Sequence, residues 1–391
     1  MLLLVVTAPV ALASGVFALQ ILLGSSKRSG KIDAIPVRPT GAIAVVVPAH
    51  DEERGIARTL LSIRAQLRSG DRLVVVADNC ADATASVARD HGATVIERTH
   101  ATLRGKGFAL AAGIDALRGD PPAIVVLVDA DCELAPGAVD ALARATTHAG
   151  RPSQARYLML HPEGASLPKR LAQFAWRVRN WARPAGWHRI GAPCQLMGSG
   201  MCFRWETLRD APIANDSIVE DMRLGIDLAL MGQPPVFCPE ALVTSMFPDS
   251  AAASKTQRMR WEHGHLEMIA RSALPLLWQG LRRRDKHLVL MALDLLVPPL
   301  ALLGALLTSL FLASLGLAWI THATEAAWMN GALVALFLAA ALQSRRAYGR
   351  DLVDLVELAA IPAYIARKLP MYGRFVTKRQ RGWVRTDRDV Q

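Results

Sequence analysis

Hydrophobic residues are distributed unevenly along this chain of 391 residues. An apolar run without charges covers residues 2–23, and long apolar runs return at residues 288–320 and 327–343. A helix needs about 20 apolar residues to span a bilayer. The pattern therefore predicts an N-terminal transmembrane anchor (residues 1–24) and a second membrane region with a basic flank (residues 271–344).

Polar residues and prolines interrupt the second membrane region. Asp294 and the pair Pro298-Pro299 lie inside the run at 288–320, which is too long for a single crossing. We expect an interfacial start followed by one main span at roughly 297–320. A tight two-span hairpin broken at the prolines is the alternative. Residues 327–343 form the next span.

Basic residues set the expected orientation of the anchor. No basic residue precedes the first apolar run, whereas Lys27, Arg28 and Lys31 follow it in a juxtamembrane linker (residues 25–40). The positive-inside rule then places residue 27 onward in the cytoplasm. A cleaved signal peptide is the alternative, because small residues occur around Ala11–Ser14. We expect a multi-pass protein of the cytoplasmic (inner) membrane.

The C-terminal part and a central Trp-Arg segment carry much of the net charge of +11. Residues 345–391 form a basic cytoplasmic tail in which residues 352–370 mix apolar and charged positions, as an amphipathic interfacial helix does. Trp176, Trp181 and Trp187 alternate with arginines. Beside membrane spans, such segments favour lipid headgroups over nucleic acid. We therefore expect membrane lipids, and no nucleic acid, as partners.

Residues 41–270 alternate short apolar runs with helical patterns. The run Ile43–Pro48 is continuous, as in a strand buried on both faces, and Glu52–Leu67 has one apolar stripe at helical spacing. This alternation predicts an α/β domain with a Rossmann-like, mostly parallel sheet. The further strands are expected at Arg72–Ala77, Thr94–Glu97 and Ala123–Val128, and the further helices at Asp82–Asp90 and Gly107–Leu117.

Candidate chemistry lies at the ends of the predicted strands, where open sheets of this class bind ligands. Asp78 ends one strand, and Asp129 and Asp131 follow another. Paired carboxylates suit Mg²⁺ or Mn²⁺. The chain has no Gly-x-Gly-x-x-Gly after its first strand and no Walker lysine motif, which disfavours hydride transfer and phosphate-loop chemistry. Its five scattered cysteines form no Cys-x-x-Cys pair, so neither a zinc site nor a disulfide framework is expected.

Seven segments in one order resemble family 2 glycosyltransferases of the membrane-bound branch. That branch includes cellulose, chitin and hyaluronan synthases and ceramide glucosyltransferase, and its nucleotide-sugar-binding fold is called GT-A. The resemblance covers about residues 43–265. The matching segments are Val45-Val46-Val47-Pro48-Ala49-His50-Asp51-Glu52, Ala77-Asp78-Asn79-Cys80-Ala81-Asp82-Ala83-Thr84, Arg104-Gly105-Lys106-Gly107, Val128-Asp129-Ala130-Asp131, Gly198-Ser199-Gly200-Met201, Glu220-Asp221 and Gln257-x-x-Arg260-Trp261.

The resemblance implies roles on the donor side. Asp131, helped by Asp129, would hold the divalent cation, which would neutralise the diphosphate as it leaves. Asp78 resembles the carboxylate that binds the uracil ring, which indicates a UDP-sugar, with another pyrimidine nucleotide or a purine nucleotide as the alternative. Arg260 has the planar donor fork that suits a diphosphate. The remaining residues assigned to donor binding are Pro48, Glu52, Lys106 and Gln257.

The resemblance also implies roles on the acceptor side. Asp221, with Glu220 beside it, is the candidate general base that takes the proton of an acceptor hydroxyl. The family often has Thr before this acid pair, whereas this chain has Val219, so a hydroxyl that would orient the acids is missing. Gly200 and Trp261 would contact the acceptor, the first by close backbone approach and the second by stacking.

These observations predict an inverting, metal-dependent hexosyltransferase that moves a sugar from a UDP-sugar to a lipid-linked or polysaccharide acceptor. The expected setting is cell-envelope or exopolysaccharide biosynthesis. About three spans are fewer than an export channel needs, which favours single addition. A processive synthase that works with a partner membrane subunit is one alternative. A non-catalytic membrane scaffold with a transferase fold is another.

Overall fold

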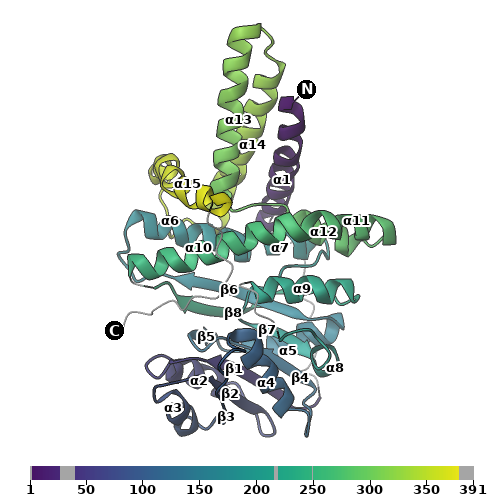
Figure 1. The fold of residues 1–391 in the computed structure, drawn as a ribbon, viewed down its shortest axis with the longest axis vertical. Helices are drawn as coiled ribbons and strands as arrows, with labels where there is room; N and C mark the ends of the chain where they lie inside the picture. The colour runs from purple at the N-terminus through teal and green to yellow at the C-terminus, as the bar shows by residue number, and fades with distance from the viewer. Residues whose placement is uncertain (1, 27–39, 215–218, 249, 378–391) are drawn as a thin grey trace. The chain divides into compact units, whose positions relative to one another are not determined.

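The computed structural model describes residues 2–26, 40–214, 219–248 and 250–377 (Figure 1). Most of the predicted juxtamembrane linker and the last residues of the predicted basic tail lie outside these ranges. The chain divides into two compact units. Among the described residues, the sheet unit comprises 40–160, 193–214, 219–248 and 250–258, and the helical unit comprises 2–26, 161–192 and 259–377. The predicted division, with residues 41–270 as one domain, stays a prediction.

The sheet unit is built on one sheet of eight strands in the order β3-β2-β1-β4-β7-β6-β8-β5. Parallel pairing joins β1 to β2 and β4, β2 to β3, and β6 to β8. Strand β7 pairs antiparallel with β4 and β6, and β5 with β8. The strands are β1 (Ile43–Ala49), β2 (Arg72–Asp78), β3 (Thr94–Arg98), β4 (Ile124–Leu127), β5 (Cys132–Leu134), β6 (Ser153–Leu160), β7 (Met201–Arg204) and β8 (Val236–Met246).

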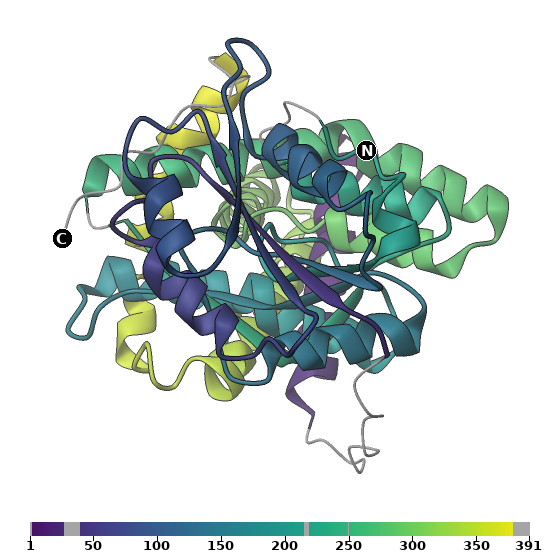
Figure 2. The ribbon, with the colours of Figure 1, turned by 90° about the horizontal axis from the view of Figure 1, so that it is seen from below.

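Helices cover both sides of these strands (Figure 2), which explains why β1 is apolar without alternation: its residues 43–47 are all fully buried. On one side Val46 and Val76 pack against α4 so closely that a Cβ at Gly113 would lie 2.6 Å from Val46 Cγ1. The helices of the unit are α2 (Ile56–Arg64), α3 (Thr84–Asp90), α4 (Lys106–Ala116), α5 (Ala138–Ala149), α8 (Trp205–Leu208), α9 (Glu220–Leu230) and the first part of α10 (Ala251–Met268). The predicted α/β class with a mostly parallel sheet is confirmed.

The predicted start of the second element is wrong. The apolar stripe predicted a helix from Glu52, but α2 begins at Ile56. The backbone N–H of Glu52 donates to Thr84 Oγ1 (2.7 Å), and the N–H of Glu53 donates to Asp82 Oδ2 (3.0 Å). These two bonds tie the segment to the first residue of α3 and to the loop before it, so the regular helix starts later.

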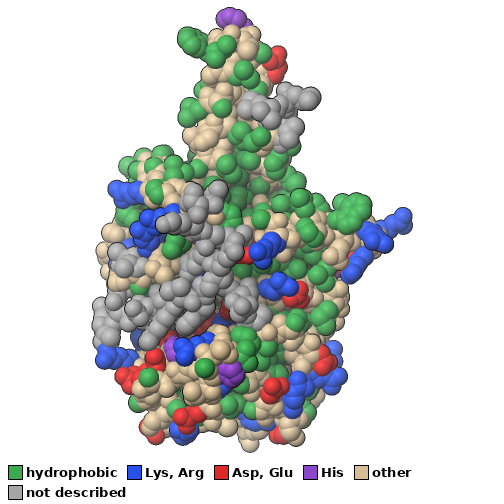
Figure 3. Space-filling model, in the orientation of Figure 1, with side chains coloured by type: hydrophobic (Ala, Val, Ile, Leu, Met, Phe, Trp, Pro, Cys, Tyr) green, Lys and Arg blue, Asp and Glu red, His purple; other side chains and the backbone are tan. Residues whose placement is uncertain are grey.

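The helical unit contains three helices long and apolar enough to cross a membrane: Val6–Ser25 of α1 (Leu2–Ser25), α13 (Leu300–Thr321) and α14 (Glu325–Tyr348). In Figure 3 hydrophobic and uncharged atoms cover most of the visible face of α13 and α14. Large apolar side chains stay exposed there, among them Trp319 at 85% and Trp328 at 79%. Apolar surface of this kind indicates contact with lipid rather than water. Membrane association is thus supported, and the predicted main span at 297–320 corresponds to α13.

Two predictions for the apolar C-terminal half need correction. The two-span alternative fails because α12 (Lys286–Leu295) has 10 residues, about half the length of a span. The helix predicted at 352–370 begins later, as a short 3₁₀ turn (Val356–Ala360) followed by α15 (Ile361–Thr377). Its expected first residues are buried instead, with Val353 at 1% exposure.

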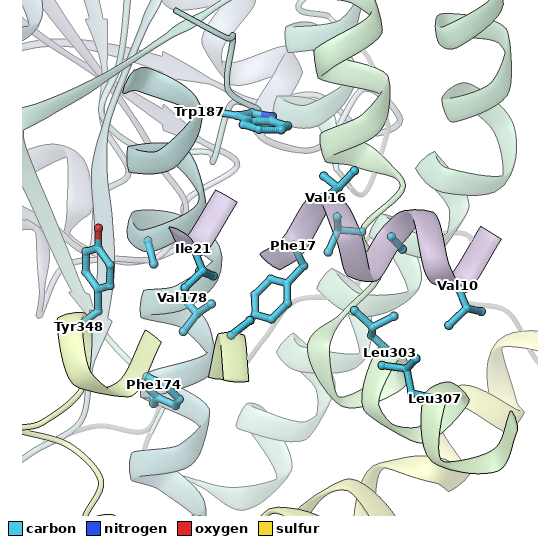
Figure 4. Close-up of a cluster of buried hydrophobic side chains, with 14 of the residues drawn as sticks. Val10, Val16, Phe17, Ile21, Phe174, Val178, Trp187, Leu303, Leu307 and Tyr348 are labelled. Carbon is cyan, nitrogen blue, oxygen red and sulfur yellow. The ribbon is translucent and has the colours of Figure 1, made fainter. Parts of the chain in front are cut away.

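A cluster of buried apolar side chains surrounds α1 (Figure 4), and further helical segments complete the described part of this unit. They are α6 (Leu167–Arg177), a π-helical turn (Val178–Ala182), α7 (Arg183–Arg189), the second part of α10, a second π-helical turn (Ile269–Ala273) and α11 (Leu274–Arg283). Phe17 and Ile21 of α1 belong to one buried cluster with Trp187 and Leu303. Trp187 is 1% exposed, so the interpretation of this tryptophan as part of an interfacial surface is wrong.

A charged network is buried in the same unit. Arg183 donates through Nε to Gln20 Oε1 (2.7 Å) and through Nη2 to Asp294 Oδ1 (2.9 Å). Gln20 Nε2 donates to the same Oδ1 (2.6 Å). Asp294, which interrupts the apolar run in the sequence, is thus the counter-ion of an arginine on α7. A Cβ at Gly186 would lie 1.9 Å from the Gln20 carbonyl oxygen, so α1 and α7 touch at their backbones.

Candidate active site

Four charged side chains meet at the strand ends of the sheet unit. Lys106 begins α4, Asp129 follows β4, and Glu220 and Asp221 begin α9. The Lys106 Nζ lies 2.5 Å from Asp129 Oδ1 and 3.9 Å from Glu220 Oε1. All three side chains are partly shielded, with 20–26% exposure. The structure therefore brings together residues assigned separately to donor binding, metal binding and catalysis.

The loop before β7 holds this cluster in place. Lys106 Nζ donates to the Gly198 carbonyl oxygen (2.7 Å), and the Asp129 backbone N–H donates to Ser199 Oγ (3.1 Å). Gly198 has φ +91°, and a Cβ built on it would lie 3.2 Å from Asp221 Oδ2 and 3.8 Å from Asp129 Oδ2. A glycine is thus favoured for its backbone and for the space beside two carboxylates.

Electrostatics in the cluster favour a cation. Burial lowers the pKa of Lys106, but the carboxylates of Asp129 and Glu220 outweigh it, so the pKa of this ammonium is raised. Burial raises the pKa of Asp129; Lys106 opposes this shift, and Asp131 adds to it. One lysine therefore faces more carboxylates than it can neutralise.

The pair predicted to bind metal fits a hard divalent cation. Asp129 and Asp131 each offer a carboxylate oxygen, and these oxygens and the Cys132 sulfur lie within 4.8 Å of one another. Ser245 Oγ donates to Asp131 Oδ2 (2.9 Å), which orients that carboxylate. Two carboxylates plus substrate phosphates are the usual ligands of Mg²⁺. The residues present therefore suit the cation that the sequence implies.

Asp78 ends β2 and is held by its neighbours. Its carboxylate accepts hydrogen bonds from Arg98 Nη1 (2.5 Å) and Asn79 Nδ2 (3.0 Å) on the same oxygen, Oδ1. Pro48 lies in the neighbouring strand β1, and Glu52 follows it in the loop. Arg98 was not predicted as a partner of Asp78. It ends β3, the strand next to the one that Asp78 ends, and a basic residue at that position is a signal that sequence reasoning can use.

The other predicted site residues have different surroundings. Gln257, Arg260 and Trp261 lie at helical spacing on α10; Gln257 belongs to the sheet unit, and the other two belong to the helical unit. There Trp261 packs against Trp176 with ring centroids 4.6 Å apart. Gly200 (φ +69°) faces packed side chains, because a Cβ on it would lie 2.7 Å from that of Ala155. The predicted roles of these residues remain predictions.

Gln154 is a residue that sequence reasoning missed. It is fully buried in β6. Its Nε2 donates to the carbonyl oxygens of Ser199 (2.8 Å) and Ala155 (2.9 Å), and its Oε1 accepts from the Met197 N–H (2.8 Å). The same strand also contains Ser153 and Arg156, so no local pattern in the sequence singles out Gln154. Gln154 fixes the loop that in turn holds Lys106 and Asp129.

Comparison with known families identifies the chain. The model described as "Glycosyltransferase like family 2" matches residues 39–264, more than half of the chain. The chain belongs to this glycosyltransferase family. The matched segment contains the acidic cluster and every strand of the sheet.

Named relatives share shorter stretches with this glycosyltransferase. The low-salt glycan biosynthesis hexosyltransferase Agl6 of Haloferax volcanii is 36% identical over 100 residues, 25% of this chain and 22% of that protein. The uncharacterized protein MJ1222 of Methanocaldococcus jannaschii is 38% identical over 89 residues, 23% of this chain and 35% of that protein. The chain thus matches about a fifth to a third of the length of these relatives.

A solved structure shares the fold over nearly the whole chain. The mannosyltransferase PcManGT from Pyrobaculum calidifontis, solved with GDP-Man and Mn²⁺, aligns with a TM-score of 0.56 and 20% identity. The alignment covers 97% of this glycosyltransferase and all of that chain. At this identity, the likeness concerns the fold alone.

Proposed function

We propose that this glycosyltransferase transfers a hexose with inversion from a nucleotide-sugar to a membrane-associated acceptor, with Asp221 as the general base. The observation that carries the proposal is the convergence of Lys106, Asp129, Glu220 and Asp221 at the strand ends. A single displacement needs a carboxylate on one side of the reacting carbon and positive charge on the other. This cluster offers both at the strand ends of the sheet unit.

The reaction forms a bond between the acceptor oxygen and the anomeric carbon and breaks the bond from that carbon to the diphosphate. The Asp221 carboxylate takes the proton of the acceptor hydroxyl, and Glu220 beside it raises the local negative charge. The bonding electrons leave with the nucleoside diphosphate. Lys106 contributes a positive charge that Asp129 and Gly198 hold in position.

Asp129 and Asp131 would hold Mg²⁺ or Mn²⁺, which supplies Lewis-acid neutralisation of the leaving diphosphate. Mn²⁺ is present in the structure of the Pyrobaculum mannosyltransferase. Stripping the cation with a chelator is expected to stop turnover, and Mg²⁺ or Mn²⁺ is expected to restore it. The Asp131→Asn variant is expected to need a higher cation concentration for the same rate.

The donor is proposed to be a UDP-sugar, because Asp78 resembles the carboxylate that binds the uracil ring in this family. GDP-Man, bound to the Pyrobaculum mannosyltransferase, makes a guanosine donor the alternative. Detergent-purified protein should therefore be screened against UDP- and GDP-sugars with membrane-lipid extract as acceptor. Release of one nucleoside diphosphate, and not the other, decides between them.

Single addition is proposed because the described residues contain three membrane-crossing candidates, fewer than an export channel needs. Mass spectrometry of the product is expected to show one added sugar. A ladder of products would instead support a processive synthase that works with a partner subunit.

The general base is tested with Asp221→Asn against a matched control, Asp227→Asn. Both residues lie on α9, but Asp227 pairs with the exposed Arg223 at 3.2 Å. We expect Asp221→Asn to lower turnover roughly 100- to 10,000-fold, with the thermal unfolding of both variants unchanged. Equal activity in the two variants would contradict the assignment, and absence of turnover with every donor in the wild type would favour a scaffold role.

A further inference from the structure

A second group of metal-ligating side chains lies apart from the acidic cluster. His50 and Asp51 follow β1, and Cys80 follows the neighbouring parallel strand β2. One ligand atom from each residue lies within 4.8 Å of the other two. The sequence predicted no zinc site because no Cys-x-x-Cys pair is present. The fold assembles a nitrogen, an oxygen and a sulfur from two loops instead.

The imidazole of His50 is oriented like that of a metal ligand. Its Nδ1 lies 2.7 Å from the carbonyl oxygen of Asp78. A carbonyl oxygen only accepts hydrogen bonds, so Nδ1 carries a proton, and in the neutral imidazole the lone pair is then on Nε2. Histidines that bind metals usually donate their other ring N–H to such an acceptor. The Nε2 atom faces Asp51 Oδ2 at 3.8 Å.

The Asp51 carboxylate is also oriented. Its Oδ1 accepts the backbone N–H of Ala81 (2.7 Å), which turns Oδ2 toward the imidazole of His50. Asp51 has φ +51° and Asn79 has φ +54°, a left-handed conformation that few residues other than glycine adopt. These backbone conformations bend the two loops, and the side chains of His50, Asp51 and Cys80 converge.

Cys80 completes the group. Its sulfur accepts the Asp51 backbone N–H (3.4 Å) and is partly exposed. Burial raises the pKa of this thiol, so a cation that binds there displaces a proton. Thiolate and imidazole select borderline-soft cations, whereas the carboxylates of Asp129 and Asp131 suit hard ones.

We propose that His50, Asp51 and Cys80 form a second cation site, for a borderline-soft divalent cation of the Zn²⁺ type. Ligand atoms of a tetrahedral zinc site lie about 3.3–3.8 Å from one another. The distance of 3.8 Å between His50 Nε2 and Asp51 Oδ2 is already at the upper end of this range. Three protein ligands leave the fourth position for water or for a ligand.

Occupancy of this site has a consequence that rests on the proposed function. His50 bonds to the carbonyl group of Asp78, the residue proposed to bind the donor base. A cation at His50 therefore lies beside the base and is expected to weaken donor binding. Zn²⁺ would then act as an inhibitor that is distinct from the Mg²⁺ or Mn²⁺ needed for transfer.

Binding is tested with Co²⁺, which replaces Zn²⁺ and reports a thiolate ligand through a charge-transfer band in the near ultraviolet. The full chain in detergent is freed of metal with a chelator and titrated with Co²⁺ in excess Mg²⁺, which keeps the acidic site filled. We expect one Co²⁺ per chain with the thiolate band, and displacement of Co²⁺ by Zn²⁺. Absence of a saturable band in the wild type overturns the proposal.

Variants assign the band to its ligands. Cys80→Ser is expected to abolish the band, and His50→Ala to weaken Co²⁺ binding at least about tenfold. Cys238→Ser, a buried cysteine outside both groups, is the matched control and is expected to retain the band. A band that persists in Cys80→Ser refutes the assignment. If the same band is lost in Cys132→Ser, the Co²⁺ is bound beside the acidic pair instead. Thermal unfolding of each variant shows that it is folded.

The consequence is measured separately, by nucleotide binding with and without Zn²⁺. Weaker binding in the wild type that Cys80→Ser no longer shows supports it. A saturable Co²⁺ band combined with unchanged nucleotide binding refutes the inhibitory consequence and leaves the cation site established. Failure of all nucleotide-sugar donors to bind refutes the proposed function. The Co²⁺ titration does not depend on donor binding, so it tests the cation site independently.

Discussion

Each unit of the molecule contains a shielded ion pair, and the two pairs are built differently. Arg183 and Asp294 in the helical unit keep 6% and 12% exposure and are joined by Gln20, so one cation meets one anion in a closed network. Lys106 and Asp129 in the sheet unit keep 20% and 26% exposure, and Glu220 and Asp221 lie nearby. The first pair is balanced, whereas the second carries surplus negative charge.

The difference distinguishes an ion pair that supports folding from a charged cluster that can bind a cation or a substrate. A buried pair whose partners satisfy each other helps to specify how helices pack, and it offers nothing to a ligand. A cluster with more carboxylates than cations keeps its charge only if a cation or a substrate joins it. Exposure and charge balance therefore distinguish the two pairs better than distance, because both are joined within 3 Å.

The largest expected effect is on the closed pair. Arg183→Met leaves Asp294 buried without a counter-ion, and we expect the free energy of unfolding to fall by about 3–5 kcal/mol. Thermal unfolding in detergent measures the change. The double variant Arg183→Met/Asp294→Leu removes both charges and is expected to recover most of the loss. A double variant as unstable as the single one would show that the network contributes more than charge compensation.

The lysine of the open cluster is expected to matter for turnover instead. Lys106→Met removes a positive charge from the site, and we expect turnover to fall roughly 100- to 1,000-fold. Because water reaches Asp129, the free energy of unfolding should change by about 1 kcal/mol or less. Nucleoside diphosphate release and thermal unfolding are measured on the same sample. A loss of stability as large as that of Arg183→Met would erase the contrast between the two pairs.

Gln154 connects stability with chemistry and should show an intermediate effect. Gln154→Ala leaves buried backbone groups of Ser199 and Met197 without their partner, at a cost of about 1–3 kcal/mol. Since the loop before β7 also holds Lys106 and Asp129, we expect turnover to fall and the cation concentration for half-maximal rate to rise. Thr146→Val, which removes a buried hydroxyl bonded to Ser153 at 2.7 Å, is the control. It should lower stability without changing the cation requirement.

The smallest effect is expected at an ion pair of the helical unit in which one partner is exposed. Arg177 and Asp351 lie 2.7 Å apart, but Asp351 is 62% exposed. We expect Asp351→Asn to change the free energy of unfolding by less than about 1 kcal/mol. A change as large as that of Arg183→Met would mean that distance, and not burial, sets the strength of these pairs.

Local patterns predicted β1 to β4 but not β5 to β8. They also pointed to Asp129 and Asp131, whereas Lys106, Glu220 and Asp221 were assigned from the family resemblance. The continuous apolar runs placed β1, β2 and β4 because strands buried on both faces need no polar alternation. Asp129 and Asp131 were identified because they follow such a strand. The spans were predictable for a similar reason, since length and hydropathy are properties of a segment alone.

Contacts between distant segments were not predictable in this way. Nothing in the local sequence pairs Asp294 with Arg183, or brings Cys80 to His50, because the fold creates both proximities. The buried Trp187 was misread for the same reason: its neighbours in the sequence are charged, whereas its neighbours in space are apolar. The start of α2 was misplaced because the side chains of Thr84 and Asp82 accept the backbone N–H groups of Glu52 and Glu53, which were expected to begin the helix.

The hydrogen bond between Gln20 and Asp294 also bears on biosynthesis, because it joins residues separated by 274 positions. The ribosome releases Gln20 early, Arg183 long afterwards, and Asp294 later still. The amide of Gln20 therefore spends most of translation without its native partners. Native packing of the first helix is consequently a late event. While the nascent chain still ends before α12, the membrane insertion machinery and quality-control proteases are expected to meet α1 without its hydrogen bond to Asp294.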